Sequence, residues 1–177
     1  MFIDPRVMLL ACHLQPSDVV ADFGAGSGFV ARALAALVPQ GTVYAIEINR
    51  DMLPRIARDA EEHHLTNLHV VWGDVELVGG STLKAESVNF VVMSNILFQL
   101  EDRAGALAEA LRVVKPGGRL LIVDWQESFG GLGPTPQSVV TESVAEALAL
   151  KVGFTKNPTS AIPAGEHHYA LLFQKPA

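Results

Sequence analysis

Three glycines stand at alternate positions after a short apolar segment, at Gly24, Gly26 and Gly28. From Phe29 to Val38 apolar residues recur at helical spacing, so the chain is predicted to pass from a strand through the glycines into a helix. Such a turn leaves unpaired backbone N–H groups and the positive end of a helix dipole beside a gap. Because glycine has no side chain, a ligand there can touch the backbone. The stretch is therefore predicted to bind a nucleotide-like cofactor.

Carboxylates stand where the predicted strands end. Asp22, Glu47, Asp74 and Asp124 each close or directly follow an apolar segment. Because parallel strands need long crossover connections, the alternation of strands and helices predicts a parallel sheet with helices on both faces. Ligands of such sheets bind outside the carboxyl ends of the strands. The four carboxylates are therefore expected to gather around one site.

The remaining elements follow from apolar periodicity and from helix start and stop signals. Strands are predicted over residues 18–23, 42–47, 67–73, 88–93 and 119–125, with a final pair over 154–158 and 169–174. Helices are predicted from Pro5, capped by Asp4, and over 29–38, 51–65, 101–114 and 138–151. Residues 75–87 are predicted to form a loop with at most one turn of helix, and Lys115-Pro116-Gly117-Gly118 to stop a helix and turn the chain. The length predicts one domain, residues 1–177.

Polar residues narrow down the cofactor. The glycine spacing is G-x-G-x-G and not the G-x-G-x-x-G of dinucleotide binders, and a pyrophosphate would meet Asp22 at the mouth of the turn. Glu47 can accept hydrogen bonds from both hydroxyls of a ribose, and Asp74 can accept one from an adenine amino group. Together these residues predict adenosine with a cationic or zwitterionic tail and no phosphate.

Four motifs, in order, make the chain resemble a known family. They are Asp22-Phe23-Gly24-Ala25-Gly26-Ser27-Gly28, Ile46-Glu47 followed by Asn49, Gly73-Asp74, and the stretch Val113 to Leu120. With them the chain, from about residue 18 to 125, resembles class I S-adenosylmethionine-dependent methyltransferases, in the group that includes ubiquinone/menaquinone-type and other small-molecule enzymes. The resemblance implies an α/β fold with a doubly wound, mostly parallel seven-stranded sheet, helices on both faces, and an antiparallel last strand (169–174) beside the fifth.

The resemblance also assigns residues to S-adenosylmethionine. Gly24 and Gly26 would line its methionine part, and Asp22 would approach the amino group. Glu47 would hold the ribose hydroxyls and Asp74 the adenine. Ile48 and Val75 would flank the adenine ring, and Ala25 and Gly28 would complete the glycine turn. Asn95 would lie near the transferable methyl group.

Methyl transfer from a sulfonium is an in-line displacement whose leaving group is already activated. A protein contributes mainly by aligning acceptor and methyl and by excluding water, so no catalytic residue is assigned. If the acceptor must lose a proton, the bases to consider are Asp124, Glu127, His167 and His168. Each is more commonly structural or solvated, since a lone titratable residue in a sequence carries little information.

The methyl acceptor is expected to meet the loops after the fourth and fifth strands and the N-terminal segment. These offer an apolar wall of Phe2, Phe98, Trp125 and Phe129, the last beside Gly130-Gly131-Leu132-Gly133. Such a wall suits a small-molecule acceptor of apolar, aromatic or lipid-like character. Phe98 and Trp125 fit an ordinary core equally well.

Composition and sequence pattern argue against several other kinds of protein. The net charge of −6 argues against a duplex nucleic-acid partner. Cys12 is the one cysteine, so neither an intramolecular disulfide nor a multi-thiolate metal site fits, and no other metal constellation is recognised. No apolar run reaches the roughly 18 residues of a membrane span, and the N-terminus lacks the pattern of a signal peptide. We therefore expect a cytoplasmic protein, and a homo-oligomer stays open.

Two other functions stay open. A nicotinamide-dependent oxidoreductase could use a similar sheet, although the glycine spacing disfavours it. A non-catalytic methyltransferase-like subunit could bind a partner without turning over a substrate. Single residues have plainer alternatives too, since Asp74 could cap a turn and Asn95 and Gln99 could be ordinary loop residues.

Overall fold

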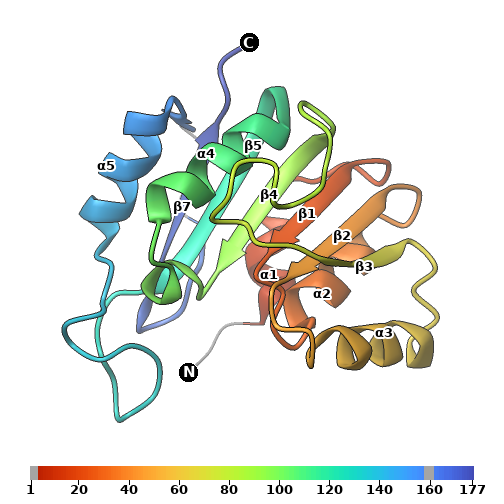
Figure 1. The fold of residues 1–177 in the computed structure, drawn as a ribbon, viewed down its shortest axis with the longest axis horizontal. Coiled ribbons are helices and arrows are strands. Elements are labelled where there is room, and N and C mark those ends of the chain that lie inside the picture. Colours follow the sequence, from red (N-terminus) through yellow and green to blue (C-terminus); the bar gives the residue numbers. More distant parts are fainter. Residues whose placement is uncertain (1–3, 158–161) are drawn as a thin grey trace.

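The computed structural model describes residues 4–157 and 162–177, which contain one seven-stranded sheet (Figure 1). Its strands are β1 Val19–Phe23, β2 Thr42–Glu47, β3 Leu68–Trp72, β4 Val88–Ser94, β5 Val114–Trp125, β6 Thr155–Lys156 and β7 His168–Gln174. Across the sheet they are ordered β3-β2-β1-β4-β5-β7-β6. Neighbours among β1 to β5 pair in parallel, whereas β7 runs antiparallel to both β5 and β6. The predicted fold class is confirmed, including the antiparallel last strand.

Helices cover both faces of the sheet. They are α1 Pro5–Leu10, α2 Phe29–Leu37, α3 Leu53–Glu62, α4 Arg103–Val113 and α5 Glu142–Val152, with a short 3-10 helix η1 at Leu97–Gln99. Helices α1, α2 and α3 pack on one face and α4 and α5 on the other (Figure 1), each set over its own apolar cluster. Asp4 caps α1 by accepting a hydrogen bond from Arg6 N–H, as predicted. Within the described ranges, no helix has the length and apolar character needed to cross a membrane.

Strand β4 shows why the middle of the sheet is apolar throughout. Phe90 and Val92 belong to the cluster under α1, α2 and α3, while Val91 and Met93 belong to the cluster under α4 and α5. All four side chains are fully buried. Successive side chains of a strand point to opposite faces, so a strand covered on both sides needs apolar residues at every position. Polar residues can therefore collect only where the strands end.

The parallel register brings the carboxyl ends of four strands to one edge. Phe23 pairs with Ile46 of β2 and with Met93 of β4. Ser94, one residue further on, pairs with Val123 of β5. The strand order reverses at β1, which has β2 on one side and β4 on the other, and such a switch point leaves a crevice beyond the strand ends. The glycine turn follows Phe23 at this edge.

One predicted turn belongs to a strand. The helix α4 ends before Lys115-Pro116-Gly117-Gly118, as predicted, but β5 already begins at Val114, so the predicted strand start at Arg119 is wrong. Val114 pairs with Val88 of β4, and the register then shifts so that residues 115–118 bulge. Lys175 holds the bulge, because its N–H donates to Gly118 O at 2.8 Å and its carbonyl accepts from Gly117 N–H at 2.9 Å. These partners are too far away in the chain for a local pattern to reveal them.

Other boundaries shift by a few residues. Helix α3 begins at Leu53 and not at Asp51, because Asp51 N–H donates to Asn49 Oδ1 at 3.0 Å in a turn before the helix. Helix α5 begins at Glu142 and not at residue 138, which still lies in a turn. Residues 75–87 contain turns and no helix. The strand predicted over 154–158 is the shorter β6, and Pro158 lies outside the described residues.

Candidate functional site

The glycine turn leads from β1 into α2. Gly24 N–H and Ala25 N–H both donate to the Ile46 carbonyl at 2.9 Å, which ties the turn to the end of β2. Gly24 and Gly26 have φ values of +74° and +53°, in the left-handed region that favours glycine. A Cβ on Gly24 would come within 2.2 Å of Ile96 Cδ1, whereas a Cβ on Gly26 would meet nothing closer than 4.0 Å. Gly26 therefore leaves its backbone open to a ligand.

The Glu47 carboxylate bridges the glycine turn and the segment after β2. Its Oε2 accepts a hydrogen bond from Gly26 N–H and its Oε1 accepts one from Asn49 N–H, both at 2.8 Å. The residue is 8% exposed. Each carboxylate oxygen keeps a second lone pair, so the side chain can accept two further hydrogen bonds. The neighbouring hydroxyls of a ribose are such a pair of donors.

A cavity of about 350 Å³ lies beside Glu47. Residues from the ends of β1, β2 and β3 and from the segment around η1 line it. Six of the ten residues predicted to bind the cofactor are on its wall: Gly24, Gly26, Glu47, Ile48, Asp74 and Val75. The structure therefore brings together the glycine turn and the carboxylates that follow the second and third strands.

Asp74 and Val75 come from the segment after β3, and Ile48 from the segment after β2. Asp74 Oδ1 accepts from Glu76 N–H at 3.0 Å, so this residue does close a turn, and its second oxygen can accept from a ligand. Val75 is buried and Ile48 is half exposed, so both bring aliphatic side chains to the cavity wall. The arrangement suits a flat heterocycle that carries an amino group.

Asp22 lies behind the glycine turn and not on the cavity wall. It is buried, and among the described residues its Oδ2 has no hydrogen-bond partner. Burial raises the pKa of Asp22 to about 7; a hydrogen bond from the Ala31 backbone opposes the rise, and the charge of Glu47 adds to it. A buried carboxyl group with a spare acceptor would be stabilised by a cationic ligand group near the turn.

Ala25 and Gly28 are the other predicted residues of the turn, and neither lines the cavity. Ala25 is buried, and its N–H is used to bind the Ile46 carbonyl. Gly28 is the N-cap of α2. Both residues belong to the turn but are not on the cavity wall, so cofactor binding by them stays a prediction.

Further residues of the cavity wall were not predicted to bind the cofactor; they come from the segment around η1, at Ile96, Gln99 and Leu100, and from the segment before α3, at Asn49 and Met52. Asn49 stands in one of the four family motifs, so a usable signal for it existed. The residues around η1 carry no local signal, because their place depends on a side chain of another strand.

That side chain is Asp124, at the end of β5. Its carboxylate is buried and accepts from Leu97 N–H and Trp125 N–H, both at 2.8 Å. Burial raises the pKa of Asp124 to about 6, against the lowering effect of these hydrogen bonds and of the Arg103 charge. Asp124 is not among the residues that line either cavity, and its hydrogen bonds hold η1 in place.

A second cavity has a volume of about 230 Å³. Residues from α1, the start of α2 and the ends of β4, β5 and β7 line it. Asn95 is on its wall, and the next residue, Ile96, is on the wall of the first cavity. Asn95 has a φ of +56°, which is uncommon outside glycine and tolerated best by asparagine and aspartate. The residue predicted to lie near the transferable methyl is thus at the boundary of the two cavities.

The described members of the predicted aromatic wall, Phe98, Trp125 and Phe129, do not line the second cavity. Trp125 is buried, Phe98 packs against the core, and Phe129 is half exposed in the loop after β5. Phe2 lies outside the described residues. Phe29 is instead the aromatic residue on this wall, at the first position of α2. The sequence analysis used Phe29 only as the start of a helical apolar pattern, although its place directly after the glycine turn was a usable signal.

Of the four bases considered, His168 is the one that lines the second cavity. Glu127 Oε1 and His167 Nδ1 form a hydrogen bond of 2.8 Å at the surface instead. The ring of Phe129 stacks on His167 with 3.8 Å between the ring centroids. The structure therefore separates His168 from the other candidates.

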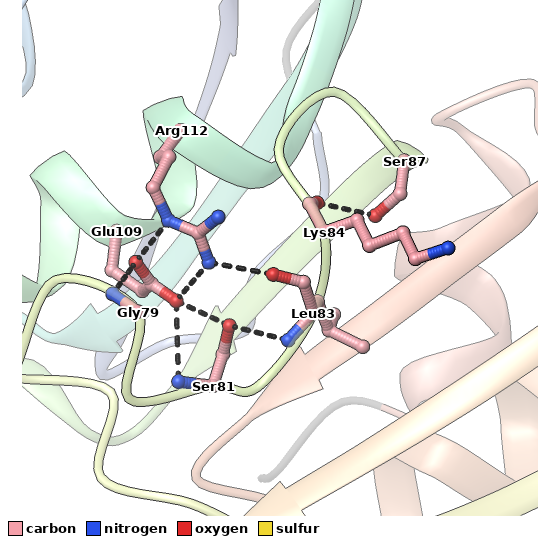
Figure 2. A network of polar contacts seen from close by, with 7 residues as sticks. All are labelled: Gly79, Ser81, Leu83, Lys84, Ser87, Glu109 and Arg112. Carbon is pink, nitrogen blue, oxygen red and sulfur yellow. Dashed lines mark hydrogen bonds and ion pairs between the residues drawn. The ribbon is translucent and has the colours of Figure 1, made fainter.

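A buried network anchors the loop that follows Asp74 (Figure 2). Glu109 of α4 is fully buried and accepts from Gly79 N–H at 2.7 Å, from Ser81 N–H at 3.1 Å and from the Ser81 hydroxyl. Arg112 donates to both Glu109 oxygens and to the Leu83 carbonyl, each at 2.7 Å. Burial would raise the pKa of Glu109, but the hydrogen bonds from Arg112, Ser81 and Gly79 outweigh it and lower the pKa to about 2.

Comparisons with known proteins agree with this geometry. Residues 21–122 match the model of a family described as "Methyltransferase domain". The ubiquinone/menaquinone biosynthesis C-methyltransferase UbiE of Legionella pneumophila (strain Lens) is 31% identical over 133 residues, 73% of this chain and 52% of that protein. Methyltransferase str2 of Strobilurus tenacellus is 32% identical over 152 residues, 81% of this chain and 51% of that protein. The crystal structure of a SAM-dependent methyltransferase from Aquifex aeolicus matches with a TM-score of 0.87 and 25% identity, over 98% of this chain and 90% of that one.

The chain belongs to the class I S-adenosylmethionine-dependent methyltransferase family. The methyl donor of this family fits the first cavity, because Glu47 keeps two acceptors, Gly26 leaves open space, and Asp22 holds a buried acceptor with no partner among the described residues. The chain spans about half the length of the two curated relatives named above.

Substituting Gly26 by alanine tests whether the glycine turn faces the ligand. The added methyl group meets open space in the protein but would enter the cavity, so Gly26→Ala should weaken S-adenosylhomocysteine binding by about tenfold or more, or about 1.4 kcal/mol. Its left-handed φ should lower the free energy of unfolding by only about 1–2 kcal/mol. Isothermal calorimetry and urea unfolding measure the two effects.

Gly130→Ala is the matched control. Gly130 has a φ of +55° and open space around a Cβ, but it lies in the loop after β5. It should share the stability loss and bind the ligand with unchanged affinity. Equal affinities of the Gly26→Ala variant and the unmodified protein would contradict the assigned cavity.

Glu109→Gln tests the network that anchors the loop after Asp74. The folded pKa of Glu109, about 2, lies below the ordinary 4.5, so its contribution to stability is full above pH 4.5 and is lost as the pH falls toward 2. The difference in unfolding free energy between the two proteins should therefore shrink from about 3 kcal/mol at pH 7 toward zero near pH 2. Denaturant unfolding at several pH values measures it. Glu101→Gln, at an exposed carboxylate, is the control, and a difference that does not depend on pH would contradict the network's role.

Proposed function

We propose that this domain transfers a methyl group from S-adenosylmethionine to a small-molecule acceptor. The observation that carries the proposal is the Glu47 carboxylate, which is buried beside the first cavity and held by two backbone N–H groups with one free lone pair on each oxygen. Gly26 and Asp74 on the same wall supply the open backbone and the second carboxylate that an adenosine ligand needs. The second cavity offers room for the acceptor.

When bound, S-adenosylmethionine supplies a methyl group on a positively charged sulfur, which a nucleophile can attack in line. The residues of this chain would bind, orient and exclude water. Glu47 and Asp74 would fix the two ends of the nucleoside. Asn95 and Ile96 face different cavities from one short segment, so that segment would set the alignment of acceptor and donor. Because the leaving group is already activated, no protein acid is required for its departure.

The second cavity supports a small, mainly apolar acceptor. Its volume is about 230 Å³, and its wall includes Met8, Phe29, Val30 and Val123. The name of the relative from Legionella pneumophila, a C-methyltransferase of ubiquinone/menaquinone biosynthesis, is compatible with an apolar small molecule. Since the chain spans about half of that relative, the activity and the acceptor are proposals for this protein.

Predictions of the domain organisation, location, partners and oligomeric state come from the sequence. That residues 1–177 form one methyltransferase domain is a proposal supported by the single sheet in which all seven strands pair. The cytoplasmic location, the absence of a nucleic-acid partner and a homo-oligomeric state stay predictions from composition and sequence pattern.

The two alternative functions differ in what the cavities would do. A nicotinamide dinucleotide would bring a pyrophosphate to the glycine turn, where the carboxylates of Asp22 and Glu47 would repel it. A non-catalytic subunit would bind S-adenosylmethionine or its product without turnover. The first alternative is therefore tested by binding, and the second by product formation.

Calorimetry with S-adenosylhomocysteine and with NAD tests the donor. We expect micromolar or tighter binding of S-adenosylhomocysteine and no binding of NAD, and Glu47→Ala should weaken the first by about 1.5–3 kcal/mol. Glu62→Ala, at an exposed carboxylate of α3, should leave it unchanged. Binding of NAD with no binding of S-adenosylhomocysteine would refute the proposal. Methylated product from a panel of small apolar acceptors would exclude a non-catalytic subunit.

A further inference from the structure

One peptide unit on the wall of the first cavity lies just beyond the paired part of the sheet. Strands β2 and β3 lie side by side (Figure 1), and their paired register ends with Glu47 opposite Trp72. The chain after β2 continues with Ile48 and Asn49, which both line the first cavity. Beyond the paired register, side chains set the orientation of the peptide between these two residues.

Those side chains come from the last residue of each strand. Glu47 Oε1 accepts a hydrogen bond from Asn49 N–H at 2.8 Å, and Trp72 Nε1–H donates one to the Ile48 carbonyl at 2.9 Å. This N–H and this carbonyl belong to the same planar peptide unit. Because the two hydrogen bonds hold opposite sides of the unit, it cannot rotate without breaking one of them.

The indole of Trp72 is held by a further contact outside the cavity. The guanidinium of Arg50 lies over its ring, with 4.2 Å between Cζ and the ring centroid. A cation over the face of a tryptophan is attracted by the ring. Trp72 is 43% exposed and is not among the residues that line either cavity. The indole therefore contacts the cavity wall through the Ile48 carbonyl.

The same peptide unit holds the carboxylate that is proposed to bind the ribose. Asn49 N–H donates to Oε1 of Glu47, whereas Gly26 N–H donates to Oε2. If the peptide turned away, Oε1 would lose its donor and the carboxylate could rotate about the bond to Gly26. A binding group that is already fixed in its bound position binds more tightly, because less freedom is lost when the ligand arrives. Trp72 thus contributes to the preorganisation of Glu47.

Resting on the proposed function, we propose that Trp72 is a positioning residue for S-adenosylmethionine. Its indole N–H orients the peptide between Ile48 and Asn49, the N–H of that peptide orients the Glu47 carboxylate, and the carboxylate binds the ribose hydroxyls. The affinity for the methyl donor therefore depends on a side chain that does not line the cavity.

Trp72→Phe tests the orientation of the peptide in the protein without ligand. Phenylalanine keeps an aromatic ring for Arg50 but has no N–H to donate. Amide hydrogen exchange, measured by NMR, should become about two- to tenfold faster at Asn49, the scale of one neutral hydrogen bond. The Gly24 amide, which donates to the Ile46 carbonyl, should exchange at an unchanged rate.

A double-mutant cycle tests whether Trp72 acts through Glu47. In the unmodified protein, Trp72→Phe should weaken S-adenosylhomocysteine binding by about two- to tenfold in calorimetry. In a Glu47→Ala protein, the same substitution should change the affinity by less than about twofold, because the carboxylate that it positions is gone. A residue that only stabilises the fold would give the same fold-change in both proteins.

Tyr44→Phe is the matched control. It also removes one polar hydrogen from an aromatic side chain, at a residue of β2 that lines neither cavity. It should bind S-adenosylhomocysteine with unchanged affinity. Trp72→Leu removes the indole N–H with a different side chain and should show the same dependence on Glu47. Urea unfolding followed by circular dichroism verifies that each variant is folded.

Three results would overturn the inference: unchanged exchange at Asn49, unchanged affinity of the Trp72→Phe protein, or the same loss of affinity with and without the Glu47 carboxylate. Each leaves the proposed function standing as long as the unmodified protein binds S-adenosylhomocysteine. No binding by the unmodified protein would refute the proposed function, and this inference with it.

Discussion

The site depends on one carboxylate that two backbone segments share. Glu47 accepts N–H groups from the glycine turn and from the chain after β2, so the relative position of these two segments is fixed before a ligand arrives. The turn can take this course because Gly24 and Gly26 adopt left-handed φ values. The carboxylate thus has a structural role in the free protein and keeps the lone pairs that a ribose would use. Preorganisation and ligand recognition rest on the same two oxygens.

Two other buried carboxylates, of Asp124 and Glu109, hold loops in place. Asp124 fixes η1 and Glu109 fixes the loop after Asp74, so two segments next to the first cavity are held by side chains that do not line it. Their pKa values differ for a physical reason. Burial raises that of Asp124, whereas Glu109 is hydrogen-bonded directly to the Arg112 guanidinium and is lowered. Asp124, which the sequence analysis considered as a base, thus holds a loop through its hydrogen bonds, as Glu109 does.

Local sequence patterns predicted the features that are determined by residues close together in the chain. The strand ends at Asp22 and Glu47 and the alternation that builds the sheet are of this kind, and the structure confirms the sheet. Local sequence patterns did not predict the features whose hydrogen-bond partners are distant in the chain. The bulge at residues 115–118 needs Lys175, and the Glu109 network needs Ser81, so neither could be inferred from its own segment. Phe29 is an example, since helical periodicity predicted only that it begins a helix, whereas in the structure it lines the second cavity.

The central claim is that the first cavity binds the adenosine of S-adenosylmethionine against Glu47. A crystal structure with S-adenosylhomocysteine tests it most directly. The account predicts both ribose hydroxyls within hydrogen-bond distance of the Glu47 oxygens, the adenine amino group at Asp74, and the sulfur at the boundary between the two cavities. A ligand bound elsewhere, or one whose ribose does not contact Glu47, would contradict it.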